Sequence, residues 1–93
     1  MNEQIEICIP RVSVSIPRKQ ISNLFIQLNI GYIGRIIENP LRSDPKYKRV
    51  IIQVKWDNNK ELAKKIQETL QENKHMNIVY DMPWFWKIYA NRR

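Results

Sequence analysis

The ten residues from Tyr47 to Trp56 constrain the fold more than any other part of the chain. Apolar side chains occupy every second position in the middle of this stretch, namely Val50, Ile52 and Val54. The intervening positions carry a mainly basic and polar set, namely Arg49, Ile51, Gln53 and Lys55. Because successive side chains of a strand point to opposite faces, this alternation predicts a β-strand over about residues 48–55 with one buried face and one basic face.

Shorter alternating or apolar stretches predict the other strands. They lie at about residues 5–9, 33–37, 78–80 and 84–90. We expect Pro10 to stop the first strand, because proline cannot donate a hydrogen bond to a sheet. Gly34 permits a bulge in the second. The segment 39–46 contains two prolines and several turn-forming residues, so it is predicted to be a loop.

Two amphipathic helices are predicted between these strands. In the first, the apolar face consists of Ile21, Leu24, Phe25 and Leu28 at helical spacing. Ser15 is its expected N-cap, with Pro17 in the first turn and Gly31 at the C-cap. The second helix is expected to be capped within Asp57–Asn59. Its apolar face consists of Leu62, Ala63, Ile66 and Leu70.

The order of these elements is β-α-β-β-α-β, with a small extra strand before the last. This order predicts one α+β domain over residues 1–93, a four-stranded antiparallel sheet with two helices on one face. The other face is then open to water. It is expected to present Glu6, Cys8, Arg49, Ile51, Gln53 and Lys55, so any function of the sheet depends on these residues and the flanking loops.

Composition limits the class of protein. With 43% hydrophobic and 27% charged residues, the chain has the composition of a globular domain, and its net charge of +7 favours polyanionic partners. The alternative is a basic surface that is simply solvated. Because the apolar runs are much shorter than the roughly 20 residues of a membrane span, no membrane partner is expected. The single Cys8 fits a reducing compartment, and the start of the chain lacks signal-peptide features, so we expect an intracellular, non-secreted protein. Cys8 and His75 alone do not make a zinc site, and no cofactor is expected.

Several motifs resemble the RNA recognition motif (RRM) family, which has a ferredoxin-like fold. The first-strand hexamer of that family is similar to Ile7-Cys8-Ile9-Pro10-Arg11-Val12, and the third-strand octamer to Tyr47–Val54. Its helices resemble the stretch from Ile21 to Gly31 and the pair Ala63 and Ile66. The resemblance covers nearly the whole chain and implies RNA binding by the open sheet face.

A narrower resemblance is to the short, stand-alone RRM-like proteins of giant DNA viruses. It is carried by Ile9-Pro10-Arg11-Val12, Tyr47-Lys48-Arg49-Val50 and the segment from Val79 to Lys87. This resemblance implies a viral protein in the cytoplasm or nucleus of the host, or in the virion.

The chain departs from the RRM pattern where that family stacks bases on aromatic rings. Those positions carry Cys8, Arg49 and Ile51. Since stacking on an aromatic ring contributes about 1–3 kcal/mol per base, we expect weaker and less specific binding than that of a standard RRM. Arg49 replaces one ring in part, because a guanidinium both stacks on bases and pairs with phosphate.

If the protein binds nucleic acid, the final strand must supply the missing rings; the alternative, which is favoured, is that most of these rings fill the core or cover the sheet edge. In the favoured register Trp84, Trp86 and Ile88 face the core, and Phe85, Lys87 and Tyr89 face the open side; the opposite register remains an alternative. The predicted nucleic-acid-binding residues are Arg11, Lys48, Arg49, Ile51, Gln53, Lys55, Phe85, Lys87 and Tyr89. Arg42 and Lys46 in the loop are candidates for further phosphate contacts, with a solvated loop as an equal alternative. Arg92 and Arg93 at the chain end could also contact phosphate, but a solvated terminus is favoured there.

The rival hypothesis is a protein-interaction or self-association module, a degenerate RRM acting in viral assembly or as a virion component. Here Cys8 and Ile51, exposed among charges, or the tryptophan-rich final strand would dock on a protein or a second copy of the chain. Catalysis is not expected: His75 is predicted to lie away from Cys8, the carboxylates are scattered, and a glycine-rich phosphate loop is missing.

Overall fold

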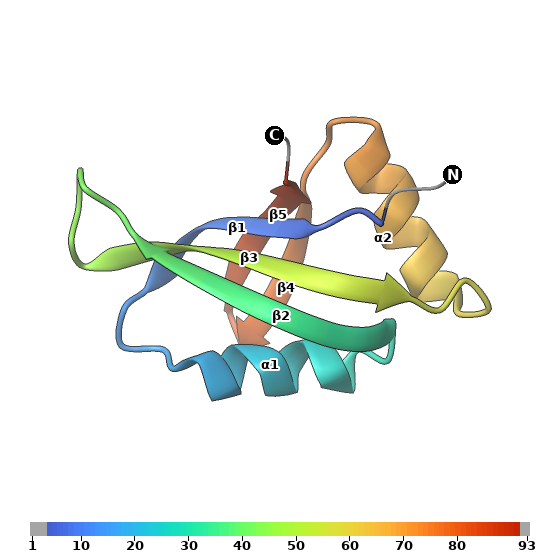
Figure 1. The fold of residues 1–93 in the computed structure, drawn as a ribbon, viewed down its shortest axis with the longest axis horizontal. Coiled ribbons are helices and arrows are strands. Elements are labelled where there is room, and N and C mark those ends of the chain that lie inside the picture. Colours follow the sequence, from blue (N-terminus) through green and yellow to red (C-terminus); the bar gives the residue numbers. More distant parts are fainter. Residues whose placement is uncertain (1–3, 92–93) are drawn as a thin grey trace.

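The computed structural model describes residues 4–91 and contains five strands and two helices (Figure 1). In chain order they are β1 (Ile7–Ser13), α1 (Arg18–Gln27), β2 (Gly31–Pro40), β3 (Tyr47–Trp56), α2 (Glu61–Gln71), β4 (Met76–Asp81) and β5 (Trp84–Ala90). Among the described residues, neither helix is both long and apolar enough to cross a membrane.

The strands form one antiparallel sheet in the order β2-β3-β1-β5-β4. The predicted α+β class is therefore confirmed, and the arrangement is compatible with a ferredoxin-like fold. The sheet has five strands rather than the predicted four. The expected small extra strand is the six-residue β4, which pairs with β5 along its length and forms one edge of a five-stranded sheet.

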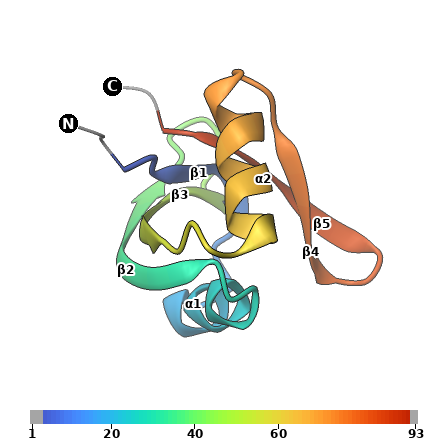
Figure 2. The same ribbon diagram turned by 90° about the vertical axis from the view of Figure 1, so that its right-hand side faces the viewer.

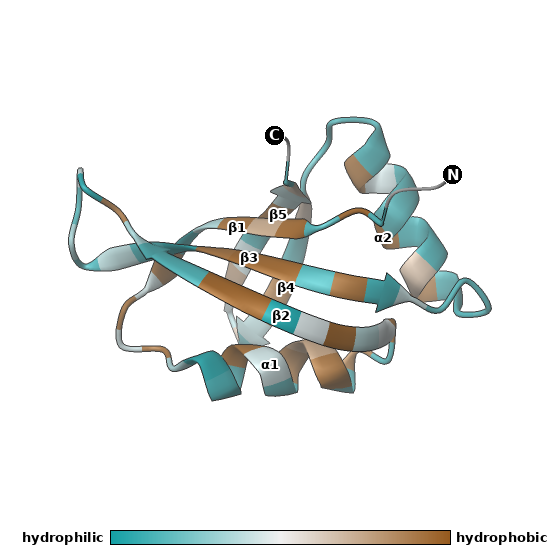
Figure 3. Cartoon of the chain, viewed as in Figure 1, coloured by the Kyte–Doolittle hydropathy of each residue, from teal (hydrophilic) through white to brown (hydrophobic). Residues whose placement is uncertain are grey.

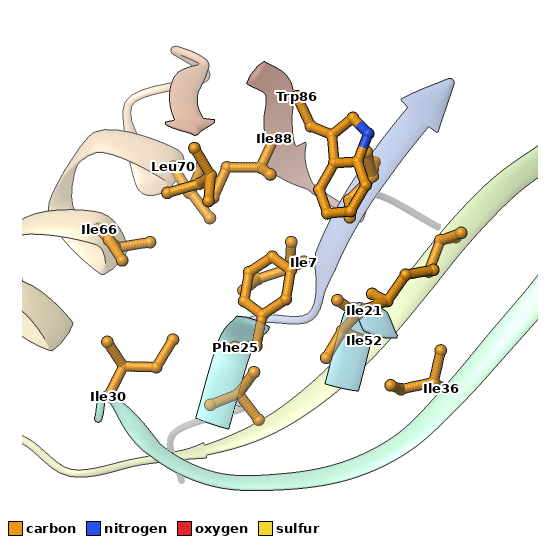
Figure 4. Close-up of a cluster of buried hydrophobic side chains, with 14 of the residues drawn as sticks. Ile7, Ile21, Phe25, Ile30, Ile36, Ile52, Ile66, Leu70, Trp86 and Ile88 are labelled. Carbon is orange, nitrogen blue, oxygen red and sulfur yellow. The ribbon is translucent and has the colours of Figure 1, made fainter. Parts of the chain in front are cut away.

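Both helices pack on the same side of the sheet, and their apolar residues meet in one core (Figure 4). The fully buried residues of the helices are Ile21 and Phe25 from α1 and Ala63, Ile66 and Leu70 from α2. The sheet contributes the predicted alternating set Ile7, Ile9, Val50, Ile52 and Val54. Hydrophilic residues dominate the rest of α2 (Figure 3), and Leu62, predicted to be in its apolar face, is partly exposed.

Pro10 does not end the first strand, contrary to the prediction. β1 continues to Ser13, and its pairing with β3 shifts between Ile9 and Val12. This irregularity lets the strand pass through a residue without an N–H donor. As a result, Arg11 lies in β1.

The predicted helix ends were also wrong. Pro17 is the N-cap of α1, and the hydroxyl of Ser15 instead lies 2.8 Å from that of Ser13. The N-cap of α2 is Lys60. The Asp57 carboxylate instead accepts the backbone N–H of Asn59 at 3.0 Å and closes a turn that precedes the helix. After α1, Asn29 takes the left-handed conformation expected for Gly31, with φ 56°.

The β4–β5 hairpin is joined to the rest of the sheet over a short distance only. The register of β5 on β1 comprises the pairs Ile7 with Ala90 and Cys8 with Tyr89. Beyond these pairs the two strands diverge, and the hairpin turn projects from the body of the molecule (Figure 2). The first half of β5 therefore pairs with β4 alone, which opens a gap beside β1.

Candidate nucleic-acid interface

Strand pairing identifies the side chains of the face that the helices leave uncovered. Residues directly opposite each other on neighbouring strands point to the same side. Cys8 pairs with both Ile51 and Tyr89, and Lys55 pairs with Tyr32. By alternation along β3 and β5, the same face carries Arg49, Gln53, Phe85 and Lys87. β1, β3 and β5 thus form most of the predicted basic face, and β2 forms one edge of it.

The centre of this face is closed, contrary to the prediction that Cys8 and Ile51 are exposed. Cys8 is 6% and Ile51 is 5% exposed. Arg49 on β3 donates a hydrogen bond to the side-chain carbonyl of Asn91, which follows β5, over 3.0 Å. Since β1 lies between these strands, the Arg49 side chain crosses β1 and covers the central apolar row. Ile51 is therefore not a contact residue.

A polar network continues from Arg49 across the face. Asn91 donates its amide to the Glu6 carboxylate over 2.9 Å, and Gln53 donates to the other Glu6 oxygen over 3.1 Å. The network fixes the Arg49 guanidinium and surrounds the Glu6 carboxylate with donors. Hydrogen bonding of this kind reduces the penalty that a carboxylate imposes on a surface meant for anions.

The final strand adopts the favoured register. Trp86 and Ile88 are buried on the core side, while Phe85 and Tyr89 are exposed on the open side. Trp84 shares the core side but is 63% exposed, because it stands at the projecting end of the hairpin. Tyr89 also contacts the His75 ring, with 5.7 Å between ring centroids.

One aromatic residue of the face was missed from sequence. Tyr32 on β2 is 73% exposed and lies opposite Lys55. Ile33 faces the core, so alternation along β2 places the preceding residue, Tyr32, on the open face. The bulge between Ile33 and Ile36 shifts the alternation only further along β2. The open face thus has Tyr32 at one corner and Phe85 toward the opposite corner, with Tyr89 on the same margin as Phe85 but beside Cys8.

Lys48 is not available to nucleic acid, contrary to the prediction. Its side chain points to the core side, as Val50 does, and the residue is 8% exposed. The ammonium donates to the backbone carbonyl of Ile16 over 2.6 Å and to the Glu38 carboxylate, which also accepts a 3.0 Å hydrogen bond from Arg18. Lys48 therefore links β3, β2 and the start of α1.

This ion pair predicts a loss of stability in acid. The hydrogen bond from Lys48 lowers the pKa of Glu38 below its ordinary 4.5. A lowered folded-state pKa stabilises the fold fully above 4.5, and the stabilisation disappears as pH falls through the folded pKa. In thermal melts between about pH 5 and about pH 3, we expect the Tm of Glu38→Gln to fall less steeply than that of the unmodified protein. Parallel slopes would contradict this role of Glu38.

Arg11, predicted as a phosphate contact, lies at the end of the face beside the hairpin. Its guanidinium is 4.2 Å from the centroid of the Tyr47 ring and forms an ion pair of 3.1 Å with Asp44, and its side chain is 62% exposed. Asp44 therefore holds the β2–β3 loop, which contains Arg42 and Lys46, against β1. Arg92 and Arg93 lie outside the described residues.

Two hollows border the open face, one at each aromatic corner. The first, of about 360 Å³, is lined by Gln4, Glu6, Tyr32, Gly34, Gln53, Val54 and Lys55. The second, of about 590 Å³, lies in the gap between β1 and the hairpin and includes Arg11, Tyr47, Trp84 and Phe85. Each therefore combines an aromatic ring with a cation.

The described residues contain no cluster of three or more potential metal ligands. β5 with Tyr89 stands between Cys8 and His75. Searches with the sequence and the structure found no matching protein family, curated protein or solved structure. The chemistry of the open face is therefore the basis for a functional proposal.

Proposed function

We propose that this protein binds single-stranded nucleic acid, RNA foremost, through the open face of its sheet and with little sequence preference. The observation that carries the proposal is the pairing of exposed rings with cations at opposite corners of the face. Tyr32 stands opposite Lys55 at one corner, and Lys87 lies between Phe85 and Tyr89 toward the other. Aromatic rings supply stacking platforms and cations supply phosphate contacts, the two requirements of single-strand binding.

The path between the corners supports the same function. It runs diagonally from Lys55 past Gln53 and Arg49 to Lys87, and its polar groups are held in place by the network through Glu6 and Asn91. Phosphate contacts of this kind position a strand without reading its sequence. The open face has aliphatic residues at its centre and aromatic rings only at its margins, which fits an RRM-like protein that lacks the usual central aromatic residues. The proposal therefore includes a relationship to the RRM family and to its short viral members.

The proposal predicts a steep dependence of binding on salt. If about four phosphates are neutralised, the affinity for a labelled single-stranded oligonucleotide should fall about 50-fold between about 50 mM and about 200 mM salt. Fluorescence anisotropy titrations measure this fall. The double variant Lys55→Gln, Lys87→Gln should reduce the slope of log affinity against log salt by about 1.4, or 0.7 for each lost contact.

A matched control removes the same charge from the opposite side of the molecule. Lys64 and Lys65 lie on α2, which covers the other face of the sheet. The variant Lys64→Gln, Lys65→Gln should keep the wild-type slope. Absence of binding at low salt refutes the proposal. If the two double variants reduce the salt slope equally, the open face has no special role in binding.

The exposed apolar residues at the end of the β4–β5 hairpin favour a second candidate function, protein interaction. Four apolar residues are exposed there, Val79, Met82, Trp84 and Phe85. Exposed apolar patches often mark protein contacts, which supports docking on another protein or a second copy of the chain. Burial of Ile51 removes the observation that first motivated this rival. Sedimentation at rising protein concentration tests self-association, and a species that stays monomeric counts against the homodimer.

A further inference from the structure

The gap between β1 and the β4–β5 hairpin forms a groove on the border of the open face. β1, β3 and α1 line one side of it, through residues such as Arg11, Tyr47 and Gln20, and the hairpin lines the other. Its volume of about 590 Å³ exceeds that of the hollow beside Tyr32. The groove exists because β5 leaves β1 after the Cys8–Tyr89 pair.

The walls of the groove are unusually aromatic, and one ring is free to take a new partner. Tyr80 and Trp86 already stack on each other, with 4.3 Å between centroids and 15° between planes. Tyr47 has the Arg11 guanidinium over its face. Trp84 is 63% exposed and lines the same groove. A flat aromatic ligand entering the groove therefore meets an open indole.

Charged groups at the groove indicate the kind of aromatic ligand. Arg11 stands on one side and the Asp81 carboxylate on the other. A carboxylate repels phosphate but accepts hydrogen bonds from N–H groups such as those on nucleobase edges. Arg11 is placed to contact a phosphate or a base carbonyl. Arg11 and Asp81 together therefore suit a nucleobase that lies inside the groove while its phosphate lies outside, toward the open face.

We infer that the groove holds one nucleobase of the bound strand, stacked on Trp84. This subsite rests on the proposed function and extends it beyond the sheet face. Phe85 connects the two regions, because it lines the groove and also belongs to the open face beside Lys87. A strand that follows Lys87 past Phe85 reaches the groove with its next base.

The experiment uses Trp84 both as probe and as target. Because Trp56 is buried and does not line the groove, quenching of tryptophan emission by an unlabelled single-stranded oligonucleotide reports on the two groove residues Trp84 and Trp86, of which only Trp84 is exposed. Trp84→Ala should lower the affinity roughly 5-fold to 140-fold, with an unchanged salt slope because no charge is lost. Trp84→Phe, which keeps a ring, should stay within about threefold of wild type.

Met82→Ala provides the control at the same hairpin. Met82 is 80% exposed but does not line the groove, so this variant should bind like wild type. If wild type binds and Trp84→Ala binds equally well, the base subsite is refuted and the proposed function stands. If wild type itself fails to bind at low salt, the proposed function is refuted. Loss of a dimer on sedimentation of Trp84→Ala, with oligonucleotide affinity intact, assigns the hairpin end to protein contact and also overturns the subsite.

Discussion

Replacing Gly31 by alanine is expected to lower the free energy of unfolding by at least about 3 kcal/mol. Gly31 begins β2 with φ +145°, a conformation that residues with a Cβ rarely adopt. A Cβ there would lie 2.2 Å from the backbone oxygen of Lys55 and 2.9 Å from the backbone nitrogen of Asp57. Both contacts are to backbone, so rotation of a side chain cannot relieve them.

The measurement is thermal or denaturant unfolding, and Gly34→Ala is the matched control in the same strand. A Cβ at Gly34 would lie 3.3 Å from the backbone oxygen of Gln53, without a positive φ. We expect Gly34→Ala to change stability by less than about 1 kcal/mol, whereas Gly31→Ala should lower Tm by roughly 10–20 °C. Equal Tm values for the two variants would contradict the pairing of Gly31 with Trp56 and, with it, the placement of Tyr32 on the open face.

The sheet could be predicted from sequence because its inward residues follow a strict period of two. Val50, Ile52 and Val54 are buried as expected, and Ile7 and Ile9 join them on β1. Helix ends were less predictable. The polar side chains of Ser15 and Asp57 bond within their own turns instead of capping a helix. Local hydrogen bonds of this kind compete with capping, and sequence spacing does not decide between them.

The residues that share the open face could be predicted from sequence, but their exposure on that face could not. Alternation placed Arg49, Gln53 and Lys55 correctly, yet it cannot reveal that Arg49 reaches Asn91 and covers Ile51. That contact joins residues 42 positions apart. Lys48 is a different case. Its parity with Val50 already indicated the core side, and the prediction gave its charge more weight than its position.

Removing the Glu38 carboxylate is expected to cost about 3 kcal/mol of folding stability, because it leaves a buried ammonium without its counter-charge. The Lys48 side chain is 10% exposed, and in Glu38→Ala it would retain only the hydrogen bond to the backbone carbonyl of Ile16. Arg18, whose side chain is 63% exposed, would turn to solvent at little cost. Urea denaturation measures the change. In the double variant Glu38→Ala, Lys48→Met, part of the loss should return, because the unpaired charge is gone.

Glu61→Ala is the control for this prediction, since it removes a carboxylate that is 96% exposed and 4.0 Å from Lys64. Exposed pairs contribute about 0–1 kcal/mol, so Glu61→Ala should leave stability nearly unchanged. The Glu38 variant also separates structure from function. Because Lys48 stays on the core side, oligonucleotide affinity per folded molecule should be unaffected in Glu38→Ala. A marked gain in affinity would mean that Lys48, once released from Glu38, reaches phosphate, and that Lys48 belongs to the proposed binding surface after all.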